Sequence, residues 1–176
     1  NGNKCKELLK RFEEGNLTSE DVANNAEDGG WLPIHFAMFV CRGEGVLDLV
    51  NFLFDLHPNC VKAKTYDGEL PIHVMPDSSS IATQEEIDQI QRDQTGARRF
   101  LMEKYPEGIK EKDSDGGTIL HTAVAYKYNI IASTVLEQFP ELAKQGNFAK
   151  QLPLHYACEE GNYEIVSKLI QAYPEG

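Results

Sequence analysis

Short segments with the apolar spacing of helices alternate with turn-forming clusters along most of the chain. In residues 163–172, the apolar positions 165, 166, 169 and 170 fall on one helical face. Gly161 precedes this segment, and Tyr173-Pro174 ends it because the residue before a proline disfavours the α region. A shorter apolar segment with Pro153 near its start precedes Gly161, and proline is well tolerated at a first helical position. The pattern predicts pairs of short helices joined by turns.

The same arrangement recurs four times, marked by a histidine and, further along, by a proline. Residues 30–35, 68–73, 116–121 and 150–155 align on their final histidine, and these histidines lie 38, 48 and 34 residues apart. The prolines at positions 58, 106, 140 and 174 follow them at intervals of 23, 33, 19 and 19 residues. Two phased markers indicate a repeat with a 34-residue period, lengthened by four and by fourteen residues in its first two copies.

These repeats resemble ankyrin repeats, whose period is about 33 residues and whose signature is Thr-Pro-Leu-His-x-Ala. The closest copy is residues 152–170, which keep the Pro-Leu-His-x-Ala core, the Gly-Asn break and a Glu-Ile-Val-x-x-Leu-Ile second helix. Ile119 replaces the motif proline, Lys127 replaces the glycine between the helices, and aromatic-Pro-Glu endings indicate a divergent subtype. The resemblance implies an all-α fold, an ankyrin-repeat α-solenoid of stacked helix-turn-helix units with short turn or hairpin loops.

The resemblance covers residues 27–176 and divides them into four units, at about 27–64, 65–112, 113–146 and 147–176. The second unit carries an insertion over residues 76–93, because Pro76 falls three residues after the motif histidine and breaks the inner helix. Thr83-x-x-Glu86 has the pattern of a capping box. We expect it to open a longer helix that ends near Tyr105.

The two ends of the chain differ from the repeats. Residues 4–14 place apolar side chains on one helical face, and Ser19 caps a second short helix, so residues 1–26 are predicted to form an N-terminal helical cap. A degenerate repeat is the alternative. The last unit keeps an apolar second helix. We expect that its outer edge is incomplete and is covered by further repeats or by a partner, because stacked repeats need polar capping units.

Composition and charge narrow the class of partner. The chain has 176 residues, is 41% hydrophobic, and carries 17 basic and 28 acidic residues for a net charge of −11. This charge argues against nucleic acid or an anionic membrane as the main partner. No apolar stretch approaches the length of a membrane helix, which argues against membrane insertion. The four cysteines show no CxxC spacing, which favours an intracellular, reducing setting over secretion.

Candidate catalytic chemistry is sparse. The sequence contains no phosphate-binding glycine motif, nucleophile elbow or HExxH motif, so we predict that the chain is not an enzyme and uses no cofactor. Zinc needs clustered ligands, which are absent, so no metal site is expected. Four histidines share one repeat phase, and the resemblance implies a structural role in which each hydrogen-bonds backbone and ties adjacent turns. These structural residues are His35, His73, His121 and His155. Cys158 is expected to be a small buried residue.

The remaining candidate for function is a surface. In the ankyrin family a partner usually meets the concave face, and this chain is interpreted as a non-catalytic module that binds another protein there. Carried over by position, the predicted partner-binding residues are Asp28, Trp31, Phe39, Tyr66, Asp67, Glu69, Ser114, Asp115, Tyr126, Phe148, Gln151, Glu159 and Glu160. Packing of Trp31 against the cap or the insertion is the alternative for that residue. A structural or assembly subunit, or the regulatory segment of a larger enzyme, are the alternative functions.

Overall fold

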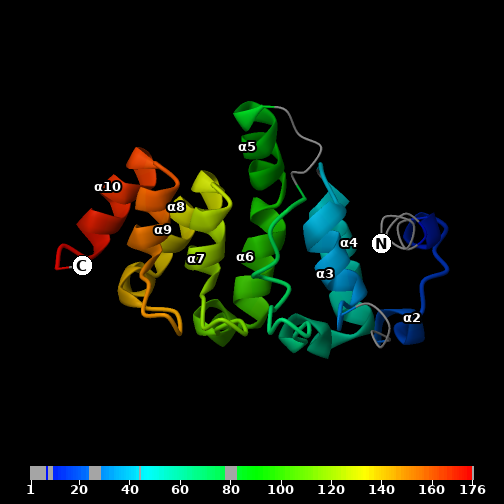
Figure 1. The fold of residues 1–176 in the computed structure, drawn as a ribbon. Coiled ribbons are helices and arrows are strands. Elements are labelled where there is room, and N and C mark those ends of the chain that lie inside the picture. The colour runs from blue at the N-terminus through cyan, green and yellow to red at the C-terminus, as the bar shows by residue number, and fades with distance from the viewer. Residues whose placement is uncertain (1–6, 8–9, 24–28, 44, 78–82, 176) are drawn as a thin grey trace.

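The computed structural model is a row of antiparallel helix pairs (Figure 1). It describes residue 7 and residues 10–23, 29–43, 45–77 and 83–175. Within these ranges the chain contains helices, turns and loops and no strand, which confirms the predicted all-α class. The α-helices are α2 (Ser19–Ala23), α3 (Pro33–Val40), α4 (Gly45–Leu56), α5 (Gln84–Asp93), α6 (Thr95–Lys104), α7 (Ile119–Ala125), α8 (Asn129–Gln138), α9 (Pro153–Glu159) and α10 (Tyr163–Ala172).

Three of the pairs, α3/α4, α7/α8 and α9/α10, are built in the same way. The inner helices α3 and α9 begin at Pro33 and Pro153, and α7 begins at Ile119, so the motif proline is not required to start the helix. Each outer helix ends two residues before a proline, as the sequence predicts. A short 3₁₀ helix begins at the proline that follows each of α4, α6 and α8, and the sequence pattern did not predict these three elements. They are η1 (Pro58–Lys62), η2 (Pro106–Lys110) and η3 (Pro140–Lys144).

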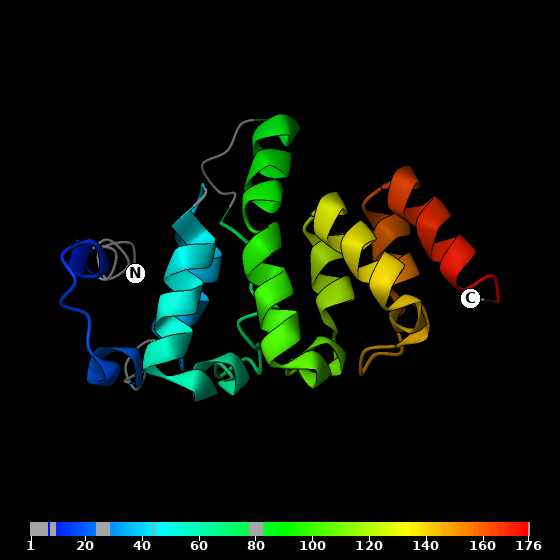
Figure 2. The same cartoon turned by 180° about the vertical axis from the view of Figure 1, so that it is seen from behind.

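The second unit has no inner helix. Residues 71–73 form a single turn, and residues 74–77 then leave it in a non-helical conformation, as Pro76 predicts. The capping box is present, because the Thr83 side chain accepts from the Glu86 N–H and the Glu86 carboxylate accepts from the Thr83 N–H. It opens α5, which is followed after one residue by α6, so the predicted long helix is confirmed. α5 and α6 form one tall column that rises above the neighbouring helices (Figure 2).

Buried polar side chains of this column replace the missing inner helix. The Arg98 guanidinium donates to the carbonyl oxygens of Ile72 and Val74, both at 2.6 Å. The Gln94 amide donates to the carbonyl of Met38 near the end of α3, at 2.7 Å. These carbonyls have lost helical partners, and a buried carbonyl without a partner is costly. Arg98 is buried without a carboxylate partner, and this burial lowers the pKa of Arg98 to about 10.

A third residue on the same face of the column contacts the next unit. Gln91, Gln94 and Arg98 are spaced three and four residues apart, so they share one face. The Gln91 side-chain oxygen accepts from the N–H groups of Ile130 and Ile131, at 2.9 and 3.2 Å. These N–H groups lie in the first turn of α8, where the helix itself offers them no carbonyl acceptor. The column therefore joins the first unit to the third through backbone groups.

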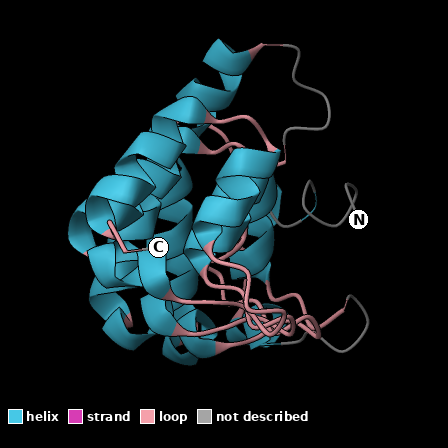
Figure 3. Ribbon diagram, turned by 60° about the vertical axis from the view of Figure 1, so that its left-hand side comes forward, coloured by secondary structure: helices cyan, strands magenta, loops and turns pink. Residues whose placement is uncertain are grey.

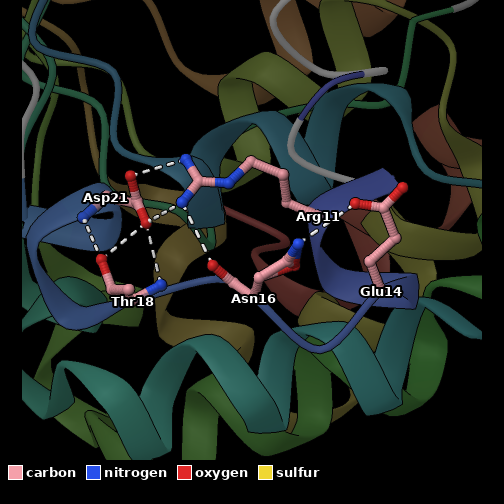
Figure 4. Close-up of polar contacts among 5 residues, drawn as sticks. All are labelled: Arg11, Glu14, Asn16, Thr18 and Asp21. Carbon is pink, nitrogen blue, oxygen red and sulfur yellow. Dashed lines mark hydrogen bonds and ion pairs between the residues drawn. The ribbon is translucent and has the colours of Figure 1, made fainter.

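An ion pair fixes the N-terminal helices. Residues 7 and 10–13 are helical, and the Arg11 guanidinium donates to both oxygens of Asp21 at 2.7 and 2.6 Å (Figure 4). This hydrogen bonding, assisted by Thr18, lowers the pKa of Asp21 to about 2. Thr18 precedes α2 and bonds to Asp21, so it takes the capping position that the sequence assigned to Ser19. The Phe12 ring lies 5.1 Å from the Phe52 ring of α4, which supports the interpretation of this segment as a cap.

Candidate functional site

The turns that connect the units stack into a continuous backbone ladder. Figure 3 shows these loops gathered at one end of the helices. Each turn donates one N–H to a carbonyl of the turn before it. The pairs are Tyr66 to Gly29 at 2.7 Å, Ser114 to Asp67 at 2.8 Å, and Phe148 to Asp115 at 2.9 Å. The ladder fixes the turn tips relative to one another, and with them the predicted binding residues that the turns carry.

Glycine permits this close stacking. Gly30, Gly68 and Gly116 have φ angles of 81°, 77° and 76°, in the left-handed region. A Cβ atom on Gly68 would lie 2.9 Å from the Ser114 nitrogen, and one on Gly116 would lie 2.6 Å from the Phe148 ring. Lys150 occupies the same position in the fourth unit with a φ of 62°. Its side chain is exposed, which indicates that no turn within the described residues stacks closely on this position.

The buried motif histidines tie the start of each inner segment to backbone at the end of the same unit or the start of the next. Nδ1 of His35 accepts from the Leu32 N–H at 3.0 Å, so its Nε2 carries the proton and donates to the Ala63 carbonyl at 3.1 Å. His73 and His121 make the same pair of contacts, with Nε2 donating to the carbonyls of Gly108 and Gln151 at 3.2 and 3.0 Å respectively. Desolvation lowers the pKa of His35 and His73 to about 4, so both are neutral at pH 7.

His155 differs from the other three. Its Nδ1 accepts from the Leu152 N–H at 2.9 Å, but its side chain is exposed and its Nε2 has no partner among the described residues. The motif therefore forms its local hydrogen bond here without the second bond, which the other three histidines make to a carbonyl far along the chain. Cys158 on the same helix is exposed as well, so the prediction that it is buried was wrong. Both residues lie on α9, in the last described unit, where no helix packs beyond.

Beside the ladder, the surface contains a hollow of about 380 Å³ whose lining includes four carboxylates, and we call it the acidic hollow. Asp67, Glu69, Asp113 and Asp115 line it, and none of them forms an ion pair with a lysine or arginine among the described residues. Asp113 accepts instead from the N–H groups of Asp115 and Gly117. Burial raises the pKa of Glu69, and the neighbouring Asp67 and Asp113 add to this effect.

A second hollow, of about 390 Å³, is lined mainly by apolar side chains, and we call it the aromatic hollow. Trp31 and Phe39 line it from the first unit, and Val74, Met75 and Pro76 line it from the second. The hollow occupies the place where residues 74–77 fail to form helical turns. The Trp31 ring packs at 5.2 Å from Phe36 and 5.4 Å from Phe39, so it lies against its own unit and stays partly exposed.

The two hollows are contiguous. Glu69, Thr122 and Tyr126 line both of them, and together the hollows form what we call the groove. Tyr126 is 65% exposed at the end of α7, so its ring stands between the acidic and the aromatic side. The volume of each hollow lies within the range of about 300–1,000 Å³ that is typical of ligand pockets. The groove thus runs across all four units, from Trp31 in the first to Asn147 and Tyr156 in the fourth.

The structure brings together about half of the residues that the sequence predicted for partner binding. Those lining the groove are Trp31, Phe39, Asp67, Glu69, Ser114, Asp115 and Tyr126. Tyr66 and Phe148 stand on the turn tips with 72% and 73% of their surface exposed. Gln151 is held by Asn147, while Glu159 and Glu160 lie at the exposed end of α9, where Glu160 pairs with Lys127 at 3.0 Å. Asp28 lies outside the described residues.

Sequence reasoning missed one side of the groove. Val74, Met75 and Pro76 were interpreted only as a break in the motif, although that break opens the aromatic hollow. Tyr128 lines the hollow as well, and its hydroxyl donates to the Pro76 carbonyl. A hydrophobic Val-Met-Pro segment in place of an inner helix was the signal available in the sequence. Its consequence depends on the neighbouring units, which the sequence does not place in space.

The described residues contain no group of three histidine, cysteine or acidic side chains arranged to hold a metal ion. In the part of the chain that the structure describes, no helix has the length and apolar character needed to cross a membrane. What the fold defines is a repeat solenoid with a ladder of turns beside a groove.

Comparison with known families agrees with this class. Residues 90–175 match the family model of ankyrin repeats, which represents three copies. The chain belongs to the ankyrin-repeat family, whose members generally mediate protein–protein interaction and are typically non-catalytic. No curated protein matches the chain. The helix pair α3/α4 lies outside the matched residues, yet it carries the same histidine contacts and the same left-handed glycine turn.

Proposed function

We propose that this chain is a non-catalytic interaction module that binds another protein in the groove on its concave side. The observation that carries the proposal is the continuity of the two hollows across the four units, with Tyr126 between them. Partly exposed aromatic side chains such as Trp31 and Tyr126 are enriched among residues that dominate binding energy. A groove between rigid stacked units also loses little conformational entropy on binding.

A binding experiment tests this proposal. A partner is first captured with the whole chain and identified by mass spectrometry. Trp31→Ala combined with Tyr126→Ala should then weaken its binding by at least about 2 kcal/mol. The matched control is Tyr163→Ala, because Tyr163 is 83% exposed on α10, away from the groove. Circular dichroism must show that each variant is folded. Unchanged affinity of the folded double variant, or equal loss in the control, would rule out the groove.

An assembly role is the second candidate. Ile170 and Tyr163 expose apolar surface on α10, and the unpartnered Nε2 of His155 lies at the same end of the row. A subunit that docks through this end should associate as its concentration rises. Light scattering after size exclusion measures this association, and Ile170→Glu should abolish it if the end is responsible. If the chain stays monomeric at high concentration, the assembly role is excluded and binding in the groove is the function that is left.

A further inference from the structure

The two sides of the groove have different chemistry, and this difference specifies what fits. Asp67 and Asp115 project from exposed turn positions into the acidic hollow, with Glu69 half-buried between the two hollows. Because no lysine or arginine of the described residues pairs with them, their mutual repulsion is not compensated within the unbound chain. A cationic side chain would supply the missing charge. An acidic or phosphate-bearing partner would add repulsion in a chain whose net charge is already −11.

The aromatic side requires an apolar occupant. Val74 and Met75 are buried and form its floor, and Trp31 and Phe39 are partly exposed at its edge. Water in such a hollow has few polar partners, so an apolar side chain that displaces it gains free energy in proportion to the area covered. Tyr126 separates the two sides, and its ring face is available to the stem of a long cationic side chain.

We infer that the groove binds a short linear segment of a partner protein that carries a lysine or arginine close to an apolar side chain. The cationic group lies among the carboxylates of Asp67, Glu69 and Asp115, and the apolar side chain enters the hollow lined by Trp31 and Met75. This inference rests on the proposed function and names the chemistry of the partner. Charge complementarity selects the first residue of the segment and burial of apolar area selects the second.

Selection from random peptides tests the inference without a known partner. A phage-displayed library of random linear peptides is selected on the whole chain, and in parallel on Asp67→Asn with Asp115→Asn. Neither side chain makes a hydrogen bond in the described structure, so the substitutions should leave the fold intact. The matched control is Glu103→Gln with Glu137→Gln, which removes two exposed charges from the outer helices α6 and α8.

A plug variant tests the junction of the two hollows. Thr122 lines both and its side chain makes no hydrogen bond in the described structure, so Thr122→Trp should fill the groove while the protein stays folded. Ser167→Trp on the exposed side of α10 is its control. Affinities of selected peptides, made synthetically, are measured by isothermal titration calorimetry for each variant, together with peptides in which the basic residue is replaced by glutamine.

The expected result is a set of peptides enriched in a basic residue next to an apolar one. Their affinity should fall about tenfold or more with the aspartate variant or the glutamine peptide, and be lost with Thr122→Trp, while both controls bind normally. Peptides that bind in the groove but lack a basic residue would overturn the inference and leave the proposed function standing. Peptides that bind the Thr122→Trp variant normally, or no selected peptide at all, would overturn both.

Discussion

At the scale of single residues, the glycines of the repeats differ in how closely neighbouring atoms approach their Cα atoms. Gly68 and Gly161 both adopt left-handed φ angles, of 77° and 65°. A Cβ on Gly68 would meet the backbone of the next turn, whereas a Cβ on Gly161 would meet nothing within 4 Å. The first glycine is needed for its conformation and for close approach, and the second for its conformation alone. Lys127 shows that the second kind of position accepts a side chain.

This difference leads to a paired prediction. Gly161→Ala should lower the free energy of unfolding by about 1 kcal/mol, the cost of a left-handed alanine. Gly68→Ala should cost about 2–4 kcal/mol, because the turn at Ser114 must also move to relieve the overlap. Chemical denaturation measures both variants. Equal losses would show that the ladder of turns is not close-packed in solution.

A second residue-scale prediction concerns pH. The pKa values of His35 and His73 are lowered to about 4 by burial, against about 6.5 in an unfolded chain. Between these values the unfolded chain binds protons that the folded chain does not, so the free energy of unfolding falls as the pH drops through this window. Below pH 6 each histidine should contribute a slope of about 1 kcal/mol per pH unit.

Denaturation curves at several pH values between 7 and 5 measure this slope. His35→Gln with His73→Gln should flatten it, even if the variant is less stable at pH 7. His155→Gln is the matched control, because it removes a motif histidine that is exposed rather than buried. A double variant with the slope of the natural chain would show that these two histidines do not titrate as buried groups.

At the scale of elements, the column of α5 and α6 stands in for the missing inner helix of the second unit. An inner helix would satisfy its own backbone groups, whereas residues 72–74 rely on the guanidinium of Arg98. Only a long side chain with several donors spans this distance and serves two carbonyls. The column also reaches the start of α8 through Gln91. The column therefore stabilises the non-helical segment that forms the floor of the aromatic hollow.

Removal of this support should be costly. Arg98→Met keeps most of the apolar stem but leaves the carbonyls of Ile72 and Val74 without partners, so we expect a loss of about 2–4 kcal/mol in the free energy of unfolding. Arg99→Met is the control, since Arg99 is exposed on the same helix. Thermal and chemical denaturation compare the two variants. A loss no larger than that of the control would show that water serves these carbonyls equally well.

At the scale of the whole molecule, the buried side chains form one continuous cluster along the row, and each unit packs mainly on its immediate neighbours. α9 and α10 pack on α7, α8 and η3, and make no extensive contact with α3 or α4. In repeat proteins, stability is close to a sum of unit terms and of interfaces between nearest neighbours. The groove spans all four units, with Asn147 and Tyr156 at its far end, so its geometry depends on each interface between neighbouring units.

A local destabilisation should therefore stay local. Ile165 is fully buried in α10, and Ile165→Ala should cost about 2–5 kcal/mol there. Hydrogen exchange should then increase mainly in α9 and α10, while α3 and α4 keep their protection. Leu53→Ala, at a buried position of α4, should give the opposite pattern. Uniform loss of protection along the row in both variants would indicate one cooperative unit instead.

Much of the fold was determined by the sequence alone. Local signals such as the proline after each outer helix, the Thr83 capping box and the phased histidines act within a few residues, so they can be interpreted without a structure. The resemblance to ankyrin repeats led to the prediction that Trp31, Asp67 and Glu69 bind a partner, and the structure places all three in the lining of the groove. Their role in binding stays a prediction, whereas the local signals were confirmed because helix caps and turn residues impose the same local geometry in every unit.

Only the tertiary structure decided which side chains and backbone groups of one unit contact those of another. The sequence gives no sign that Arg98 reaches the carbonyls of residues 72 and 74, since the partners are backbone atoms far along the chain. It marks His155 as a motif histidine, yet the side chain is exposed because no further unit among the described residues packs on the outer side of α9. The aromatic hollow likewise exists because Pro76 removes a helix between two aligned units. Contacts between units are set by stacking in space, and a pattern along one chain does not encode those distances.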